Sequence, residues 1–386
     1  MHRLAPVDPA PPTTPAFSAR SRILLVAPHP DDESLACGLI LQAAVRAGAA
    51  IRVVYATDGD NNPWPQRFIE RKWRIRKTDR LRWGKLRQRE AEAALITLGL
   101  RAEDASFLGL PDQGLTDRLM RDPAPMLSSF ARLIEDFAPT DLFLPSIADA
   151  HPDHNALAVT LLLILRQLAP GTRLESAWQF VVHGKNPVFF AHAGPVEGTR
   201  SEIAIKVRAI KCHQTQLRLS RKRFLDYAKR PERFLALHGA VLPPPAATLQ
   251  IVARDERHLT LFLQPRKKLF PRKLSLLAIG HDNRGTLRST LVRLSPKTMT
   301  TEIIGGAPGI RGESARVEGD HLTGMTIVLP GASLFSLEHP IFLKLSRPSI
   351  SFADAGWCEV PAFVSPARAT DAGYRERALH ESLQSV

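Results

Sequence analysis

An uninterrupted apolar run that ends at a cluster of polar residues constrains the fold of this chain more than any other feature. Residues 23–27 are all apolar, and residues 28–33 hold one histidine and three carboxylates. A strand that is apolar on both faces is typical of the interior of a parallel sheet. Apolar residues return at helical spacing from Ser34, so the polar cluster lies at a strand-to-helix turn. In open α/β sheets, ligands bind at such turns, beyond the carboxyl ends of the strands.

The length of 386 residues is too great for one ordinary core, so we expect two domains. The first, over residues 20–241, is predicted to be a Rossmann-like α/β domain with a mostly parallel sheet and helices on both faces. A proline-rich linker over 242–247 leads to a smaller domain over 248–365, which is predicted to be β-rich and sandwich-like. Residues 1–19 are predicted to form a disordered or loose lead-in, and residues 366–386 a polar tail.

The pattern of strands and helices changes between the two domains. In the first domain we expect strands at 22–27, 51–56, 106–108, 142–144 and 178–183. Helices are expected at 34–47, through 86–98 with Gly99 as a stop, at 124–137, from 154 or 155 onward, and at 201–217. In the second domain, six short β-type runs separated by turn signals indicate an all-β fold: 249–252, 259–263, 274–279, 290–294, 325–329 and 341–345.

Several absences favour a cytoplasmic location. The longest apolar run, residues 156–165, ends at Arg166 and is too short to span a membrane. The N-terminal residues 1–19 lack the apolar stretch of a secretory signal. Three widely spaced cysteines, an odd number, argue against a disulfide framework and for a reducing compartment.

The formal net charge of +14 favours anionic partners, and the positive charge is concentrated in residues 67–85. This segment reads equally well as a solvated, arginine-rich helix or flap. Its functional alternative is a flap at the rim of the site that attracts an anionic or lipid-linked substrate. Trp64, Trp73 and Trp83 among the cations suit contact with an anionic membrane, which would make the protein peripheral to it. No recognisable nucleic-acid-binding motif accompanies the charge, which disfavours nucleic acid as a partner.

Two histidine-containing clusters indicate a metal site. His29 and Asp32 follow the first strand, and the stretch His151-Pro152-Asp153-His154 follows a later one. Two imidazoles and one carboxylate suit a catalytic zinc with open coordination positions. Taken alone, the aspartates of the first cluster serve equally well as helix caps. The presence of both clusters after strands of one α/β domain favours the metal site.

The motifs resemble those of one superfamily. Pro28-His29-Pro30-Asp31-Asp32-Glu33 is similar to the signature of the LmbE-like de-N-acetylases, which include the N-acetylglucosaminyl-phosphatidylinositol deacetylases of the PIG-L type. The similarity continues through Thr57-Asp58-Gly59, Arg87-x-x-Glu90 and Leu108-Gly109-Leu110-Pro111-Asp112. It ends with His151-Pro152-Asp153-His154 and Lys206-x-x-Ala209-x-x-x-His213-x-Thr215-Gln216. It covers about residues 20–220 and implies nothing about the chain beyond Pro243.

The resemblance implies a role for each residue at a matching position. It implies zinc held by His29, Asp32 and His154, although the same ligands accept Fe2+ and other divalent ions. Asp31 would be the general base, and His151 would stabilise the oxyanion or act as an acid. Asp153 would orient His151 or a metal ligand. Arg87 and Asp112 match positions that contact the sugar.

Four other residues near these motifs carry weaker signals. Cys37 is expected to be a small buried residue, and Glu33 to support the first turn of its helix. The motif around His213 suggests a structural or site-lining role. His183 lies outside the clusters, and the sequence provides no physical argument for a function there.

Together these features predict a zinc-dependent hydrolase, an amidohydrolase acting on a linear amide. It would remove an N-acetyl or other N-acyl group from an amino sugar or glycoside, which would be a free small molecule or linked to a lipid or a phosphate. Two alternatives stay open. One is a metal-binding or carbohydrate-binding protein without turnover, and the other is a basic protein that binds an anionic surface and whose pocket is incidental. Intact Asp31 and His151 argue against the first, because binding alone requires neither.

Overall fold

A computed structural model describes ten stretches of the chain: 14–168, 172–184, 187–237, 249–264, 274–294, 300–302, 316–320, 324–330, 334–346 and 356–363. These residues separate into two compact units. The first contains the described residues up to 237 together with Gly356 and Trp357, and the second contains the remainder. The predicted linker 242–247 and tail 366–386 lie outside the described residues, and the predicted lead-in is described only from residue 14.

The first unit is built on a seven-stranded sheet with the order β3-β2-β1-β4-β5-β7-β6. Strands β3, β2, β1, β4 and β5 are parallel. At one edge, β7 pairs antiparallel with β5, and β6 pairs antiparallel with β7. The predicted Rossmann-like, mostly parallel sheet is therefore confirmed. The strand bounds are β1 (Arg22–Ala27), β2 (Ala50–Thr57), β3 (Ala105–Leu110), β4 (Asp141–Pro145), β5 (Ser176–Phe180), β6 (Gly194–Val196) and β7 (Glu232–Ala236).

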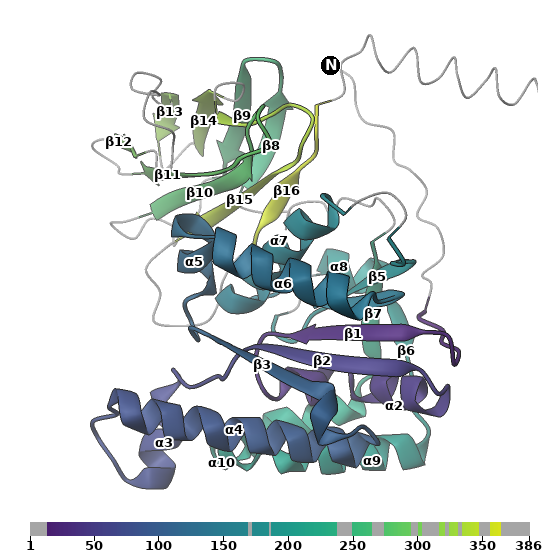
Figure 1. The fold of residues 1–386 in the computed structure, drawn as a ribbon. Coiled ribbons are helices and arrows are strands. Elements are labelled where there is room, and N and C mark those ends of the chain that lie inside the picture. The colour runs from purple at the N-terminus through teal and green to yellow at the C-terminus, as the bar shows by residue number, and fades with distance from the viewer. Residues whose placement is uncertain are drawn as a thin grey trace, which may run out of the picture. The chain divides into compact units, whose positions relative to one another are not determined.

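Helices cover both faces of this sheet (Figure 1). One group contains α1 (Asp32–Ala36), α2 (Gly38–Arg46), α3 (Pro63–Glu70), α4 (Lys77–Leu98), α9 (Arg200–Cys212) and α10 (Gln214–Leu225). The other contains α5 (Leu115–Arg121), α6 (Ala124–Phe137), α7 (Pro152–Leu165) and α8 (Pro187–His192), and the short 3₁₀ turns are η1 (Ala102–Asp104) and η2 (Asp226–Lys229). Helix α4 ends as predicted, because Gly99 takes a left-handed conformation with φ 98°.

Helix α7 explains the longest apolar run of the sequence. Every residue from Asp153 to Ile164 is buried, so the helix is apolar on all sides because protein surrounds it. In the described part of the chain, no helix combines the length and the apolar character needed to cross a membrane.

The helix predicted over 34–47 is in fact two helices, α1 and α2, that meet at Cys37. The break has a long-range cause. The carboxylate of Glu232, on β7, accepts hydrogen bonds from the backbone N–H groups of Leu39 (2.7 Å) and Ile40 (3.0 Å). A carboxylate there accepts hydrogen bonds from otherwise unpaired N–H groups of the first turn and complements the helix dipole. A new helix, α2, therefore begins at this point. Lys206 in turn donates to Glu232 over 2.5 Å, and both side chains are buried.

The helix predicted over 201–217 is also divided, into α9 and α10, at His213. His213 has non-helical backbone angles (φ −78°, ψ 61°) and its ring is fully buried. Its Nε2 lies 2.9 Å from the carboxylate of Glu33, which is 180 residues away in the sequence. This buried contact ties the start of α10 to α1.

The second unit consists of β-strands in two antiparallel sheets. All six predicted β-type runs are strands, and three strands that were not predicted, β12, β13 and β16, join them. Leucines and other apolar residues of both sheets share one core, so the predicted sandwich-like, β-rich fold is confirmed. The bounds are β8 (Leu249–Arg254), β9 (His258–Leu263), β10 (Leu274–His281), β11 (Leu287–Leu294), β12 (Thr300–Glu302), β13 (Arg316–Asp320), β14 (Gly324–Pro330), β15 (Ile341–Ser346) and β16 (Cys358–Val360).

The buried pair of Lys206 and Glu232 yields a test of stability. We expect Glu232→Ala to lower the free energy of unfolding by about 3–5 kcal/mol, because it leaves Lys206 buried without its counter-charge. Urea denaturation measures this loss. Asp122→Ala, which breaks the exposed pair with Arg118, is the matched control and should cost less than about 1 kcal/mol. Equal losses in the two variants would show that the buried pair does not stabilise α2.

Candidate metal centre

The two predicted clusters meet at the carboxyl edge of the parallel sheet. Strands β1 and β4 are neighbours, and the chain leaves them toward α1 and α7 respectively. The strand order reverses between these two strands, so the loops that follow them diverge and leave a crevice. A pocket of about 550 Å³ opens there. It is lined by His29, Asp31, Arg87, Asp112, His151 and His183, among others.

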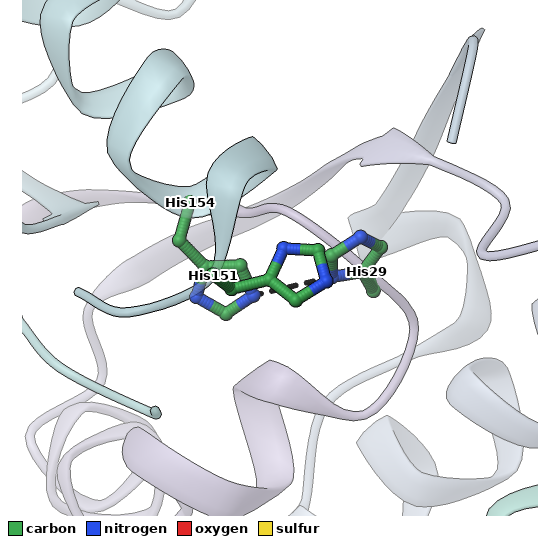
Figure 2. A group of neighbouring side chains, drawn as sticks. All are labelled: His29, His151 and His154. Atoms are coloured by element: carbon green, nitrogen blue, oxygen red, sulfur yellow. Dashed lines mark hydrogen bonds between the residues drawn. The ribbon is translucent and has the colours of Figure 1, made fainter. Parts of the chain in front are cut away.

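Three side-chain atoms face one another at the base of this crevice. His29 Nδ1 lies 3.2 Å from His154 Nε2. Asp32 Oδ2 lies 3.3 Å from the first of these nitrogens and 3.2 Å from the second. The structure therefore brings together the three residues that the resemblance assigns to the metal. Figure 2 shows the imidazoles of His29 and His154 approaching each other, with the ring of His151 beside them.

Three further carboxylates fix the orientation of these imidazoles. The outer nitrogen of His29, Nε2, lies 3.3 Å from both Asp153 Oδ2 and Asp112 Oδ1. The outer nitrogen of His154, Nδ1, lies 3.2 Å from Asp149 Oδ2. A carboxylate at the outer nitrogen holds the proton there and leaves the inner nitrogen with its lone pair exposed. In its neutral form, each of the two histidines would therefore present a lone pair toward Asp32.

Such a set of atoms suits a divalent cation. Three acceptors that face one another at 3.2–3.3 Å repel unless a positive charge lies among them. The spacing matches the edge of a zinc tetrahedron, about 3.3–3.4 Å for bonds of about 2.0–2.1 Å. All three side chains are buried, so water provides little alternative solvation. His29, Asp32 and His154 can therefore hold a divalent ion and leave part of its coordination sphere open to the pocket.

Protons are the competing cations at these atoms. Burial lowers the pKa of His154, but the carboxylates of Asp32 and Asp149 outweigh it and raise the pKa to about 9. Likewise, burial opposes the charge on His29, yet its hydrogen bonds to Asp112, Asp153 and Asp32 raise its pKa well above the usual value. The same carboxylates that attract protons in the absence of a metal favour a bound cation.

His151 is placed differently from the other two histidines. It is the N-cap of α7, and its Nδ1 accepts a hydrogen bond from the backbone N–H of Asp153 (3.2 Å). Burial and the neighbouring His29 and His154 hold the pKa of His151 well below its usual value, so the ring is neutral and carries its proton on Nε2. This nitrogen is a hydrogen-bond donor, which argues against His151 as a third nitrogen ligand, although its ring lies close enough to His29 and His154 for that role.

Asp31 lies in a strained and tightly held position. Its φ of 145° is rare for a residue with a side chain and costs of order 1–3 kcal/mol. Its backbone N–H donates to Glu33 Oε2 (3.0 Å), and its carboxylate accepts from Arg87 Nη2 (3.0 Å). Burial raises the pKa of Asp31 to about 6, although the Arg87 guanidinium opposes that shift. A carboxylate with such a pKa is suited to accept and return protons near neutral pH.

Arg87 and Asp112 both line the pocket and also hold the chain in place. The Arg87 guanidinium donates to the carbonyl oxygens of Gly59 (2.6 Å) and Pro30 (2.6 Å) as well as to Asp31. Asp112 accepts from the backbone N–H of Asn61 (2.6 Å) in addition to its contact with His29. In this structure Arg87 therefore positions Asp31, and the sugar contacts of both residues stay predictions.

Sequence analysis did not identify Asp149 or His183 as site residues. The fully buried Asp149 accepts from His154 and from the backbone N–H groups of His151, Val182 and His183. His183 follows β5, and its ring centroid lies 4.9 Å from that of His154. The signal for Asp149 was its place two residues before His151. The signal for His183 was its position after a strand that parallels β4.

These observations define a class of structure: a Rossmann-like α/β domain whose switch point holds a buried His/Asp cluster that can bind a divalent metal. Residues 24–164 match the family model described as PIG-L, GlcNAc-PI de-N-acetylase. These residues therefore match the family that the motifs resemble.

Curated relatives match the same part of the chain. Two proteins from Mycobacterium sp. strains KMS and JLS are named 1D-myo-inositol 2-acetamido-2-deoxy-alpha-D-glucopyranoside deacetylase. Each is 33% identical over 152 residues, which cover 34% of this chain and 46% of the relative. The chain thus spans about half the length of these relatives.

Similar solved structures include a conserved protein from Thermus thermophilus, with 23% identity and a TM-score of 0.43 over 59% of this chain and 100% of that chain. Another is the N,N'-diacetylchitobiose deacetylase of Pyrococcus horikoshii, with 16% identity and a TM-score of 0.44 over 57% of this chain and 84% of that chain.

The role of Asp149 can be tested through metal affinity. We expect Asp149→Asn to weaken Zn2+ binding by about 10–100-fold, because an amide fixes the His154 tautomer less well than a carboxylate. His154→Ala should weaken binding further, since it removes a ligand. Competition with a chromophoric chelator measures both, and His258→Ala, at an exposed histidine of β9, is the control. Unchanged affinity in Asp149→Asn would show that this carboxylate does not orient His154.

Proposed function

We propose that this protein is a divalent-metal-dependent hydrolase that removes an N-acyl group, in the simplest case acetyl, from an amino sugar or glycoside. One observation carries the proposal: the inner atoms of His29, Asp32 and His154 lie 3.2–3.3 Å from one another, and His29 lines a pocket together with Asp31 and His151. The family match over residues 24–164 and the names of the curated relatives support it. We infer zinc as the ion, with Fe2+ as an alternative that the same ligands accept.

The pocket residues include the proton acceptor and the hydrogen-bond donor that amide hydrolysis requires. A divalent ion held by His29, Asp32 and His154 would supply Lewis acidity toward a water molecule and the amide carbonyl. The Asp31 carboxylate takes a proton from the attacking water as the new C–O bond forms. The Nε2–H of His151 donates to the carbonyl oxygen as negative charge develops on it. When the C–N bond breaks, the proton on Asp31 passes to the departing nitrogen, so that acetate and a primary amine leave.

The arrangement favours turnover over binding alone. A protein that merely binds a metal or a sugar gains nothing from a carboxylate in a strained conformation with a pKa raised to about 6. Asp153, which the resemblance assigns to an orienting role, accepts from the backbone N–H groups of Gln113 (2.6 Å) and Leu115 (3.1 Å) while it contacts His29. It is suited to hold His29, and its own backbone N–H holds the ring of His151.

The base assignment has a direct test. We expect Asp31→Asn to lower turnover of an N-acetylated amino sugar by about 10²–10⁴-fold, because the amide cannot accept the proton. Asparagine has nearly the same size and shape as aspartate, so the fold and the metal content should be preserved. Acetate release and free primary amine measure turnover, and elemental analysis measures bound metal. A near-normal rate in this variant would remove Asp31 from the role of base.

We further propose that the segment around α3 contacts an anionic membrane. Trp64, Phe68, Ile69 and Trp73 expose between 40% and 80% of their surface, and Arg67 lies over the rings of both tryptophans. The expectation for Trp83 was wrong, because its side chain is buried and cannot contact a membrane. Aromatic side chains beside cations suit the interface of a bilayer with acidic headgroups. Trp64 also lines the pocket. A surface that docks on the bilayer there would bring a lipid-linked sugar to the pocket mouth.

This contact is testable with vesicles. We expect Phe68→Ala to weaken binding to phosphatidylglycerol vesicles about tenfold or more, because burial of a large apolar side chain contributes about 1.5–3 kcal/mol. Ile96→Ala is the matched control, since Ile96 and Phe68 are each 58% exposed and Ile96 lies near the end of α4. Sedimentation with phosphatidylglycerol and with phosphatidylcholine vesicles measures binding. Equal losses in the two variants, or no preference for the anionic lipid, would contradict the contact.

A further inference from the structure

A second pocket adjoins the one that contains the metal centre. It measures about 450 Å³ and is lined entirely by residues 219–230, from the second half of α10 through η2. We call it the α10 pocket. Leu219, Ser220, Arg223, Tyr227 and Arg230 line both pockets, so the two are adjacent and share these residues as a wall.

The α10 pocket is strongly basic. It is lined by four cations, Arg221, Lys222, Arg223 and Arg230, and by a single carboxylate, Asp226. Asp226 is already paired with Lys229 outside the pocket lining, over 2.7 Å. Within the described part of the chain, no carboxylate forms an ion pair with any of the four cations. Four positive charges around one small cavity repel one another, so an anion bound there would be stabilised.

The pocket has a defined shape because its walls are attached to the core. The backbone of Ser220 leaves helical geometry (φ −136°, ψ 27°), which kinks α10 at the start of the pocket. Phe224 is buried, and the Tyr227 hydroxyl donates to the carbonyl oxygen of Val182 over 2.6 Å. These contacts hold residues 223–227 against the loop after β5.

Arg223 connects the α10 pocket to the metal centre. One of its Nη atoms lies 3.3 Å from His183 Nδ1. A guanidinium only donates hydrogen bonds, so His183 accepts at Nδ1 and carries its proton on Nε2. The ring of His183 packs in turn against the rings of His151 and His154. A single imidazole therefore separates the guanidinium from the residues of the metal centre.

We propose that the α10 pocket binds an anionic substituent, a phosphate or a carboxylate, of the same substrate molecule whose N-acyl group lies at the metal centre. This inference rests on the proposed function and adds the charge of the substrate to it. The planar donor forks of Arg223 and Arg230 match the paired oxygens of either group. The proximity of the two pockets places the anion on the sugar or directly attached to it.

Steady-state kinetics with three substrates tests the inference. The substrates are N-acetylglucosamine, N-acetylglucosamine 1-phosphate and N-acetylmuramic acid, which are neutral, phosphorylated and carboxylated. We expect kcat/KM to be higher for at least one anionic sugar than for the neutral one. Arg230→Gln should lower kcat/KM for that anionic sugar by about 10–100-fold, the effect of losing a hydrogen bond to a charged group. Arg208→Gln, at an exposed arginine of α9 that lines neither pocket, removes the same charge and should leave kcat/KM for that sugar unchanged.

Product binding separates this inference from the proposed function. Calorimetry compares glucosamine 1-phosphate with glucosamine on the wild-type protein and on Arg230→Gln. If no substrate is hydrolysed but the phosphate adds affinity that Arg230→Gln removes, the α10 pocket is supported and the hydrolase proposal fails. If all three sugars are hydrolysed equally well and Arg230→Gln changes neither rates nor binding, the hydrolase stands and the anion site is overturned.

Discussion

The convergence of three buried polar side-chain atoms, each able to bind a proton or a metal ion, is the constraint on which the rest of this domain depends. His29, Asp32 and His154 come from loops more than 120 residues apart, and their inner atoms lie 3.2–3.3 Å from one another. Such proximity is unfavourable unless a cation lies among the atoms or the surrounding structure forces them together. Here Asp149 and Asp153 hold the outer nitrogens, and each of them also accepts backbone N–H groups of neighbouring loops. The loops are therefore built around the site.

A second layer of buried polar contacts anchors the elements that carry these loops. Glu33 accepts from the backbone of Asp31 and also contacts His213, so the strained backbone of Asp31 is held from α9 and α10. Glu232 likewise holds the start of α2, because it accepts from the backbone N–H of Leu39, and Lys206 is its counter-charge. Both anchors coincide with a break in a helix, at Cys37 and at His213. The contacts that interrupt these helices thus also fix the positions of the residues near the pocket.

How much the sequence reveals depends on whether the determining contact is local. The five parallel strands and the start of α7 follow from apolar runs and from a local N-cap, so periodicity predicts them within a few residues. The breaks at Cys37 and His213 are decided by carboxylates 180 or more residues away, which no local pattern contains. The same limit applies to the site. The motifs predicted that His29, Asp32 and His154 would meet, whereas His183 becomes part of the pocket only because β5 lies beside β4.

The positions of these residues along the chain suggest a division between chemistry and selectivity. His29, Asp31, Asp32, His151 and His154 all fall inside residues 24–164, the part that matches the family. The wall that faces them, from His183 through Arg230, follows that part. A wall outside the matched span can change its charge without disturbing the three acceptors or their supporting carboxylates. In this chain that wall is basic, with four cations around the α10 pocket against one carboxylate. Because this wall contains none of the three proposed metal ligands, its charge can differ while those ligands and the residues beside them stay the same.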